Sequence, residues 1–455
     1  NLSVFAINVW SSVQTVGRWV SRINQGFTKL LDRIEKMPQS KRLFVLFLVT
    51  YLCATPLMLG YAIADDPERL EKTDIPIFRD RVETILDGEW LYEDTEKITV
   101  TPPLINYLLV PAVLLGDTLL VWELWFTFFI FLSSVLLFYI IEPHFGTRSA
   151  VSASMLFASS PFAFFTSVAM VQDDAIIVVF LLLAFLFLAR LMWLSAAVVF
   201  GLGTMTKLFP ALCAPLTFFG PKDVKSKLKV VGFGLGSALL ISLPFILFAQ
   251  EGFFQFIEFY LLGRQPTSST QSFEEVSLIT QRGMSFWKFL AVMGLVIPTS
   301  LLHSMLLISV IGVWTAVMKE KLDIQTGFLL CLLSIFVFYS KLHFGYHLMI
   351  LGLLIPHSYR NLVRLWSLFF VSIIAMVVHY SWRGYIPSVP NWLILLLSFC
   401  LWIYWISWSV LLVKERNEPS DDRLTQVNEN RHQSSFWMIS LSFSVSILLG
   451  LNRIV

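Results

Sequence analysis

Carboxylate side chains gather in one polar stretch of the sequence. Residues 64–101 contain twelve Asp or Glu residues and five Lys or Arg residues, and the stretch lies between two long apolar runs. A carboxylate that is held in place can accept the proton of a hydroxyl group during a transfer reaction. Most of these carboxylates are expected to be solvated loop residues. Asp74 is the strongest candidate for a general base, because Pro76 stiffens the chain beside it and apolar residues follow it.

A second polar motif, Gln172-Asp173-Asp174, comes directly before a long apolar run. An aspartate at the start of a helix caps free backbone N–H groups and suits the positive end of the helix dipole. One aspartate is enough for that role, and two adjacent carboxylates at a membrane face are costly. The motif therefore predicts either a helix cap alone or a site that also binds substrate.

Two histidines, His343 and His347, are four residues apart and would share one face of a helix. This spacing permits metal binding, but no acidic residue or cysteine lies near them in the sequence. We therefore expect either two interfacial histidines with satisfied hydrogen bonds or a pair that binds phosphate or transfers a proton.

Three basic residues complete the set of candidates. Arg264 and Arg282 bracket a polar stretch in the predicted loop 250–289, where they would either grip a phosphate or anchor the loop at the membrane interface. Lys207 interrupts an apolar region, and an ionisable residue in such a place indicates a function. Its predicted position is near the cytoplasmic face, so extension of the amine towards the headgroups is the alternative.

The elements that must position these residues are membrane helices. The chain has 455 residues, of which 56% are hydrophobic and 14% charged, and its mean hydropathy is +0.72. Charged residues make up about a quarter of a typical soluble domain. The composition therefore predicts an all-α polytopic membrane protein, and no nucleic acid is expected as a partner. The four cysteines lie in apolar runs at irregular spacing, which predicts buried packing residues rather than disulfides or metal ligands.

Spans follow from the length of the apolar runs, since a helix crosses the hydrocarbon core with about 20 residues. We predict a bundle of about 11–13 transmembrane helices. Thr206, Lys207 and Pro210 break the region 195–219, which is predicted to form two short half-spans that enter as a hairpin from one side. The other predicted spans are 43–63, 119–141, 149–168, 175–193, 230–249, 290–317, 325–341, 345–357, 364–380, 390–413 and 434–451.

The positions of the basic residues predict the orientation of the chain in the membrane and distinguish an N-terminal segment from the transmembrane domain. The segment 1–42 is basic and amphipathic and is predicted to lie on the inner membrane surface. A single transmembrane domain, 43–451, follows it. The outer side would receive a large first loop, 64–118, with amphipathic helices, and a second loop, 250–289, whereas the polar loop 414–433 would be cytoplasmic.

The first loop also carries the clearest resemblance to a known family. The motif TDIPIFRDRVETILDGEWLYEDT, followed by TPPLINYLLVP, resembles the first-loop signature of two groups of GT-C glycosyltransferases. These are the polyprenol-phosphate-mannose mannosyltransferases of actinobacterial and archaeal type and the catalytic subunit of the first GPI mannosyltransferase. Both have an Asp before a Gly-x-x-x-Tyr, here Asp74, Gly88 and Tyr92. The GPI enzyme tends to carry Asp-x-Asp, and Pro76 replaces the second Asp here.

Three later motifs match the same family in order. VQDDAIIVVFLL is similar to its Gly-Gln/Asn-x-Asp junction, with Val171 where Gly is usual, and MTKLFPALCAPLTFF is similar to its Lys-x-x-Pro segment through Lys207 and Pro210. HFGYHLMILGLLIP resembles the histidine-bearing outer segment of the bacterial members. Those members tend to have adjacent histidines, so the resemblance leaves open whether His343 or His347 takes the functional place.

The resemblance covers residues 43–357 and implies a GT-C-like bundle and an inverting transfer reaction. The expected reaction moves a hexose, mannose in the similar groups, from a polyprenyl- or dolichyl-phosphate donor to a hydroxyl of a glycan or glycolipid on the outer or luminal face. Asp74 is expected to be the general base. A phosphate leaves without protonation, so no metal or other cofactor is expected, although a divalent cation stays open. The residues expected to bind substrate are Gln172, Asp173, Asp174, Lys207, Arg264, Arg282, His343 and His347.

The main alternative is a multi-span transporter or flippase of a lipid-linked or small polar substrate. Transporters tend to place charges near the bilayer midplane and to have repeated halves. Here the candidate residues fall mainly at span ends, and no repeat is found. A scaffolding subunit would not explain the aspartates and histidines on one side. The outer loops contain no Asn-X-Ser/Thr sequence, which favours a prokaryotic plasma membrane over the endoplasmic reticulum.

Overall fold

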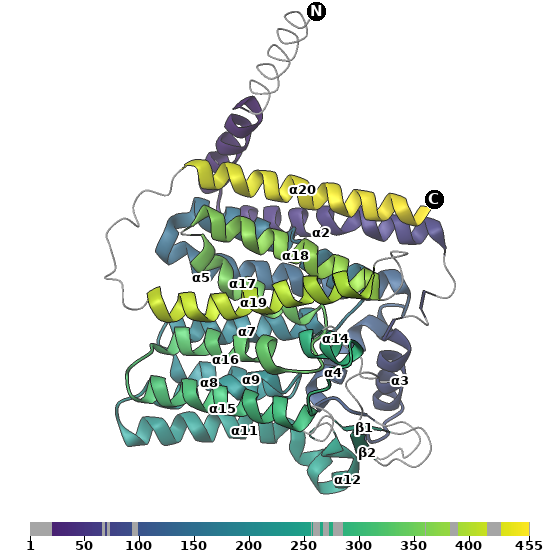
Figure 1. Cartoon of the computed structure of the whole chain (residues 1–455), viewed down its shortest axis with the longest axis vertical. Coiled ribbons are helices and arrows are strands. Elements are labelled where there is room, and N and C mark those ends of the chain that lie inside the picture. The colour runs from purple at the N-terminus through teal and green to yellow at the C-terminus, as the bar shows by residue number, and fades with distance from the viewer. Residues whose placement is uncertain are drawn as a thin grey trace, which may run out of the picture.

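Long helices with similar axis directions make up most of the chain in the computed structural model (Figure 1). Near one end of the bundle lie the elements α3 (Ile75–Leu86), α4 (Pro103–Leu114), α12 (Gln250–Phe253), β1 (Arg264–Pro266) and β2 (Phe273–Glu275). The structure describes residues 21–65, 69–70, 73–92, 99–255, 257, 264–266, 273–275, 285–359, 361–382, 390–415 and 429–454.

Within the described residues, seven helices are long and apolar enough to cross a membrane. They are α2 (Gln39–Ala64), α5 (Leu119–Ala158), α11 (Val224–Phe248), α15 (Thr299–Met318), α18 (Leu362–Trp382), α19 (Asn391–Glu415) and α20 (Glu429–Ile454). Shorter apolar helices lie among them, namely α7 (Asp174–Ala189), α8 (Trp193–Thr204), α16 (Ile324–Phe338) and α17 (Tyr346–Ser358). These elements fall on the predicted spans, so the predicted all-α polytopic architecture is confirmed.

Helix α5 contains the predicted span 119–141 and the first half of the predicted span 149–168, and its two parts meet at Gly146. This glycine has φ 76° and ψ 166°, a left-handed backbone that is strained for other residues. Both ends of the segment 117–172 contact the same outer helix, because Asp117 pairs with Arg79 and Gln172 binds Asp74. The chain between them must therefore reverse, and the break at Gly146 provides the turn.

The predicted hairpin at 195–219 is present. Helix α8 is followed by α9 (Phe209–Cys213) and α10 (Leu216–Phe219), and Gly220 returns to lie against the ring of Trp193 at the start of α8. The two ends of the hairpin therefore lie together, and its tip, near Met205, lies at the other end. There the carbonyl of Met205 accepts a 2.8 Å hydrogen bond from the backbone N–H of Leu104 in α4 (Pro103–Leu114).

The first outer loop carries the predicted amphipathic helix as α3 (Ile75–Leu86). Its buried apolar face contains Phe78, whose ring lies 6.0 Å from Trp122 and 6.1 Å from Phe126 of α5 (centroid distances). The helix ends at Asp87 and Gly88, and Gly88 adopts φ 77°, as is common after a helix C-terminus. Packing against α5 thus fixes the direction in which α3 presents its first residue.

Two further segments consist of short elements. The loop after α11 contains α12 (Gln250–Phe253), the antiparallel strands β1 (Arg264–Pro266) and β2 (Phe273–Glu275), and α14 (Phe286–Val292). Between α5 and α7 the chain forms α6 (Pro161–Phe164) and the π-helical turn η1 (Phe165–Ala169).

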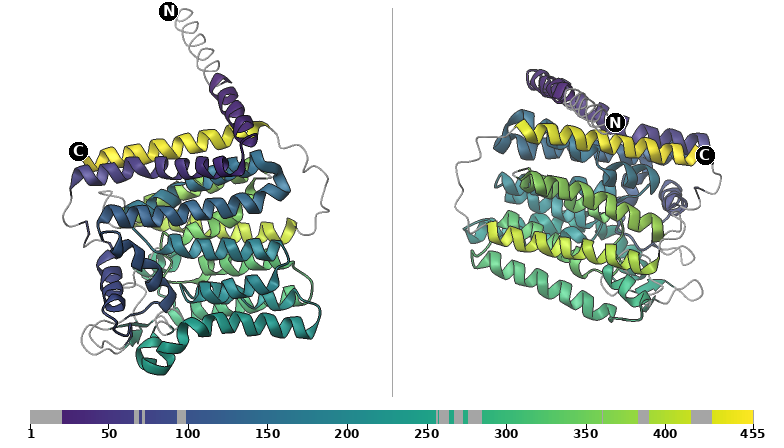
Figure 2. Two further views of the ribbon diagram at one scale, coloured as in Figure 1. Left: turned by 180° about the vertical axis from the view of Figure 1, so that it is seen from behind. Right: turned by 45° about the horizontal axis from the view of Figure 1, so that its top comes forward.

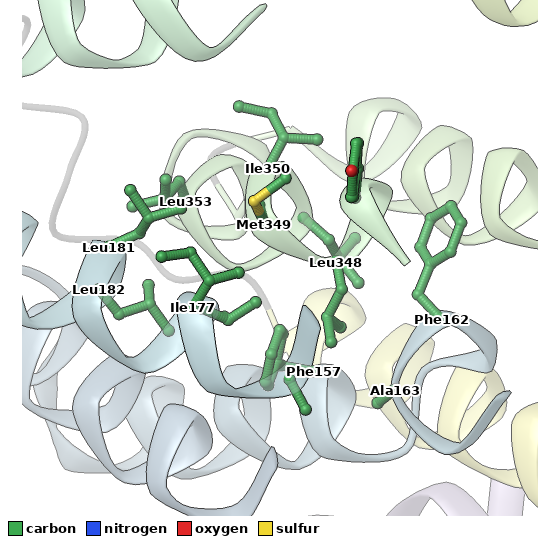
Figure 3. Packing of buried hydrophobic residues seen from close by; sticks show 14 of the residues in the cluster. Phe157, Phe162, Ala163, Ile177, Leu181, Leu182, Leu348, Met349, Ile350 and Leu353 are labelled. Carbon is green, nitrogen blue, oxygen red and sulfur yellow. The ribbon is translucent and has the colours of Figure 1, made fainter. Parts of the chain in front are cut away.

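The apolar core lies where α5, α6, α7 and α17 meet. Phe157 of α5, Phe162 of α6, Ile177 of α7 and Leu348 of α17 pack together there (Figure 3). Because α17 begins directly at the residues that contact the candidate site, this packing fixes the position of the loop 339–345 relative to the start of α7.

Helix α20, near the end of the sequence, packs against α2, near its start. Helix α20 lies beside α2 (Figure 2), where Gly60 and Gly450 allow close contact and Ser446 donates a 2.7 Å hydrogen bond to the carbonyl of Cys53.

Cys53, Cys213 and Cys331 are buried as predicted. The prediction was wrong for Cys400, which is exposed on α19, because the outside of a membrane bundle is itself apolar.

The basic N-terminal segment is described only from residue 21. Residues 21–35 form a helix whose apolar side contains the buried Phe27, and this ring lies 4.9 Å from the ring of Phe436 in α20. The helix therefore packs part of its apolar face against the bundle. The predicted contact with the membrane surface stays a prediction.

Candidate functional site

Asp74 is positioned by α3 and held by a residue far away in the sequence. It occupies the N-cap position of α3, but its side chain makes no capping hydrogen bond. Instead the backbone N–H of Ile75 is bound by the hydroxyl oxygen of Thr73 at 3.3 Å. The Oδ2 atom of Asp74 accepts a 2.7 Å hydrogen bond from Nε2 of Gln172, 98 positions away in the sequence. The half-buried carboxylate is thus oriented without being used as a cap.

The two aspartates after Gln172 hold a lysine. Nζ of Lys207 lies 2.8 Å from Oδ1 of Asp173 and also contacts Oδ1 of Asp174. Asp174 and Lys207 are only 1% and 5% exposed. The side chain of Asp173, at the N-cap of α7, makes no capping hydrogen bond. The cap-only interpretation is therefore wrong, because the structure joins both carboxylates to one amine.

The predicted cytoplasmic position of Lys207 is also wrong. The hairpin 193–220 has both its ends beside Trp193, but its tip reaches the N-terminal end of α7, where Asp173 and Asp174 lie. The amine lies inside the protein rather than among headgroups. It also lies 5.1 Å from the centroid of the Tyr346 ring, in a cation–π arrangement.

The loop before α17 closes the site, and Gly345 makes this approach possible. A Cβ atom at Gly345 would overlap Oδ2 of Asp174, so a side chain does not fit there. The next residue, Tyr346, is the one that faces Lys207. The site therefore combines the start of α3, the start of α7, the hairpin tip and the start of α17.

The two candidate histidines lie in different surroundings. His343 is half-buried, and its ring lies 5.3 Å from the ring of Tyr346, beside the site. His347 is fully buried in α17, stacked on Phe162 at 5.3 Å and close to the ring of Trp405. Among the described residues, no group of His, Cys, Asp and Glu side chains could hold a metal ion. Nδ1 of His347 lies 3.0 Å from the carbonyl oxygen of Phe344, so this histidine has the expected hydrogen bond, but it lies in the core rather than at the membrane interface.

The two arginines cannot be placed at the site. The backbone of Arg264 belongs to β1, and its side chain lies outside the described part of the chain. Arg282 also lies outside the described residues. Both remain predictions for phosphate binding.

Sequence reasoning missed three residues near the site. Gly345 and Tyr346 lie between the two histidines, but neither residue type signals a close contact with a distant aspartate. Lys341, in the loop before α17, is only 2% exposed, and burial lowers its pKa to about 8. A lysine at the end of an apolar span was the available signal for the third residue.

Val171, which stands where the similar motif usually has glycine, adopts a backbone conformation that glycine favours. Its backbone has φ 50°, a left-handed conformation that glycine adopts easily and a β-branched residue rarely does. The turn places Gln172 towards Asp74 while Asp173 and Asp174 follow at the start of α7. The family's usual glycine thus corresponds to a real requirement of the backbone at this position.

The arrangement supports proton transfer more directly than any other chemistry. One oxygen of Asp74 is fixed by Gln172, and a fixed carboxylate can accept a proton from a substrate hydroxyl. Lys207 lies between the carboxylates of Asp173 and Asp174 and compensates their charge inside the protein.

Comparisons with known proteins agree with the motifs. Residues 100–248 match the model of the dolichyl-phosphate-mannose-protein mannosyltransferase family. The match covers a third of the chain and includes Gln172, Asp173, Asp174 and Lys207, but not Asp74. It confirms the predicted resemblance to glycosyltransferases that use lipid-phosphate sugars. No curated protein matches the chain.

Two solved structures are similar in outline. They are crystal structures of ArnT from Cupriavidus metallidurans, one bound to undecaprenyl phosphate and one in the apo state. Each is 16% identical to this chain, with a TM-score of 0.48, and the alignment covers 90% of this chain and 77% of the other.

Proposed function

We propose that this protein is an inverting membrane glycosyltransferase that uses a polyprenyl- or dolichyl-phosphate sugar as its donor. The sugar is a hexose, mannose by resemblance, and the acceptor is a hydroxyl of a glycan or glycolipid on the outer or luminal face. The observation that carries the proposal is the hydrogen bond between Gln172 and Asp74 beside the Asp173–Asp174–Lys207 cluster.

In the proposed reaction, Asp74 accepts the proton of the acceptor hydroxyl while the oxygen of that hydroxyl attacks the anomeric carbon of the donor. The bond between this carbon and the phosphate oxygen breaks, and the phosphate leaves with the electron pair. Attack from the face opposite the phosphate inverts the configuration. The phosphate needs no proton to leave, so a single base is sufficient for proton transfer.

In the proposed reaction, basic side chains of the predicted outer loops stabilise the negative charge of the leaving phosphate. We assign this role to His343, which contacts Tyr346 beside Lys207, and to Arg264 and Arg282 from the second outer loop. Cations at the leaving group stabilise the charge that develops as the bond breaks. Asp173 and Asp174 are assigned to sugar hydroxyl groups, and Lys207 holds them in place.

A groove on the bundle supports a lipid-linked donor. It has a volume of about 730 Å³, lies between α15, α16 and α19, and is lined mainly by apolar side chains. Small residues such as Gly312 and Ser309 widen it, and it extends from Trp402 to Lys414. An isoprenoid chain can enter such a groove sideways from the bilayer, because its apolar surface remains out of water.

The test uses the full chain reconstituted in liposomes with membrane glycolipid extract as acceptor. We expect radiolabelled sugar to move from polyprenyl-phosphate mannose to a lipid or glycan product, and no transfer from nucleotide mannose alone. A panel with polyprenyl-phosphate glucose identifies the sugar. If no lipid-linked donor supports transfer but labelled donor crosses the bilayer in a protein-dependent way, the protein is a transporter and the proposal is wrong.

A further inference from the structure

Arg69 joins three elements inside the protein. One guanidinium nitrogen donates hydrogen bonds to Oε1 of Glu123 in α5, at 2.5 Å, and to the carbonyl oxygen of Val168 in η1, at 2.7 Å. The guanidinium also lies 3.4 Å from the ring centroid of Tyr61 in α2. Arg69 is only 7% exposed, so these contacts are shielded from water.

The carbonyl of Val168 belongs to the segment that leads to Gln172. It lies in the π-helical turn η1, and such turns often occur at functional sites. The chain then passes through the left-handed Val171, and the backbone N–H of Gln172 donates a 3.0 Å hydrogen bond to the carbonyl of Thr166. Arg69 therefore anchors the turn from which Gln172 extends.

Arg69 is also connected to Asp74 through its neighbours. The carbonyl of Leu70 accepts hydrogen bonds from the backbone N–H of Thr73 at 3.2 Å and from its hydroxyl at 2.7 Å. The hydroxyl oxygen of Thr73 in turn accepts the hydrogen bond from Ile75 at the start of α3. The position of Arg69 is thus transmitted to the residue that carries the proposed base.

We infer that Arg69 is a positioning residue that holds the turn η1 and the Asp74 segment together, so that Gln172 can orient the Asp74 carboxylate. This inference rests on the proposed function for its kinetic consequences. The ion pair with Glu123 fixes Arg69, and the bond to the Val168 carbonyl transmits the position. Arg69 itself does not contact the reacting groups.

Two substitutions separate positioning from ordinary stabilisation. Arg69→Lys keeps a positive charge near Glu123, but the lysine side chain is shorter than arginine and its ammonium does not reach the position of the nitrogen that binds both Glu123 and Val168, so we expect the contact with Val168 to be lost. We expect kcat to fall about tenfold or more while KM for the donor stays within about twofold, because a small displacement of a catalytic group lowers the rate. Glu123→Gln weakens the ion pair but leaves the Val168 contact, so kcat should fall less than in Arg69→Lys.

A double-mutant cycle gives the decisive kinetic result. If Arg69 acts through Gln172, Arg69→Lys should change kcat by less than about twofold in a Gln172→Ala background, since groups that act through one contact are not additive. Fully additive losses, or equal losses of kcat in Arg69→Lys and Glu123→Gln, would overturn the inference and leave a structural ion pair.

A crosslinking experiment tests the proximity of Asp74 and Gln172 without an activity assay. Cysteines replace Asp74 and Gln172 in a Cys400→Ser background, and a short bifunctional thiol reagent joins them in the full chain. We expect Arg69→Lys to reduce crosslinking and Arg42→Lys, at the distant pair with Glu142, to leave it unchanged. Unchanged crosslinking in Arg69→Lys overturns the inference. Arg69-dependent crosslinking, together with no sugar transfer by the wild-type protein, rejects the proposed function alone.

Discussion

The carboxylate of Asp74 is held by a partner from a distant part of the sequence. Its hydrogen bond is to Gln172, 98 residues away, and its own helix is capped without it. A carboxylate that only solvates a loop has no need of such a contact. The pairing gives Asp74 a defined orientation, which a general base requires.

At Gly345, we predict that Gly345→Ala disrupts the site. The added methyl group would overlap the Oδ2 atom of Asp174, and the aspartate would be displaced from Lys207. We expect sugar transfer to fall by about tenfold or more. The matched control is Gly236→Ala in α11, where a methyl group meets no atom within 4 Å. Equal activities for the two variants would contradict the close packing described here.

At Lys341, we predict a dependence of stability on pH. Its pKa is about 8 in the folded protein and 10.5 in an exposed side chain, so between these values the unfolded chain holds a proton that the folded chain lacks. Stability should therefore rise from pH 8 to pH 10.5, by up to about 3 kcal/mol, and the penalty for burying the charge is complete below pH 8.

The comparison with Lys341→Met isolates this effect. Thermal unfolding in detergent is measured from pH 7 to pH 10 for both proteins. The variant should be more stable than the wild type near pH 7, and the difference should shrink as the pH rises. A difference that is constant with pH would show that Lys341 remains charged in the folded protein.

At the scale of elements, the hairpin of α8, α9 and α10 carries Lys207 to the start of α7. Gly201 lets α8 lie directly against α11, because a Cβ there would overlap Ser237 and the carbonyl of Gly234. The hydroxyl of Ser237 donates to the carbonyl of Val198 at 3.2 Å across the same contact. The contact fixes the direction of α8 and hence of its tip.

We predict that Gly201→Val separates α8 from α11. The valine cannot fit without a backbone shift, and such overpacking typically costs about 1–3 kcal/mol. The melting temperature should fall, and activity should fall because Lys207 moves with the hairpin. Gly232→Val, on an open face of α11, serves as the control and should change neither quantity appreciably. A Gly201→Val protein as stable and active as this control would refute the role of the contact.

The positions of the spans follow from the sequence because an apolar run of sufficient length has few alternatives in a membrane. The break at Lys207 and Pro210 also predicts the hairpin. How far this hairpin reaches into the bundle does not follow from the sequence, because it depends on how α8 packs against α11 at Gly201. For the same reason the sequence predicts Lys207 near the cytoplasmic face. The sequence also does not reveal that Asp173 and Asp174 both pair with this lysine.

The site residues were predictable to different degrees. The sequence identifies Asp74 and the Gln172-Asp173-Asp174 motif, but it does not reveal the hydrogen bond between them. His347 has the same residue type as His343, and only its aromatic surroundings show that it packs in the core. Gly345 carries no chemistry of its own, so its importance appears only in three dimensions.

At the scale of the whole molecule, the candidate site and the outer loops lie at one end of the helix bundle. Figure 1 shows α3, α4, β1 and β2 near this end, and the N-terminal helix leaves the bundle from the other end. The basic run of residues 221–229 covers the start of α11, which then leads to α12 beside the predicted outer loops. The predicted orientation therefore places the site outside the cytoplasm.

We predict that this orientation is visible by labelling of intact cells. In a Cys400→Ser background, Glu89→Cys after α3 should react with a maleimide that cannot cross membranes. Lys225→Cys at the start of α11 should react only after the membrane is permeabilised. Both positions are exposed, so burial does not limit the reaction. The opposite pattern would reverse the topology and place the site on the cytoplasmic side.

The central claim is that Asp74 is the base of a sugar-transfer reaction, and one measurement addresses it directly. The initial rate of transfer from polyprenyl-phosphate mannose is compared for wild type, Asp74→Asn and Asp87→Asn, the last of which changes the carboxylate at the other end of α3. We predict a fall of about 10²–10⁴-fold for Asp74→Asn and a rate within about twofold of wild type for Asp87→Asn. Full activity in Asp74→Asn would contradict the account.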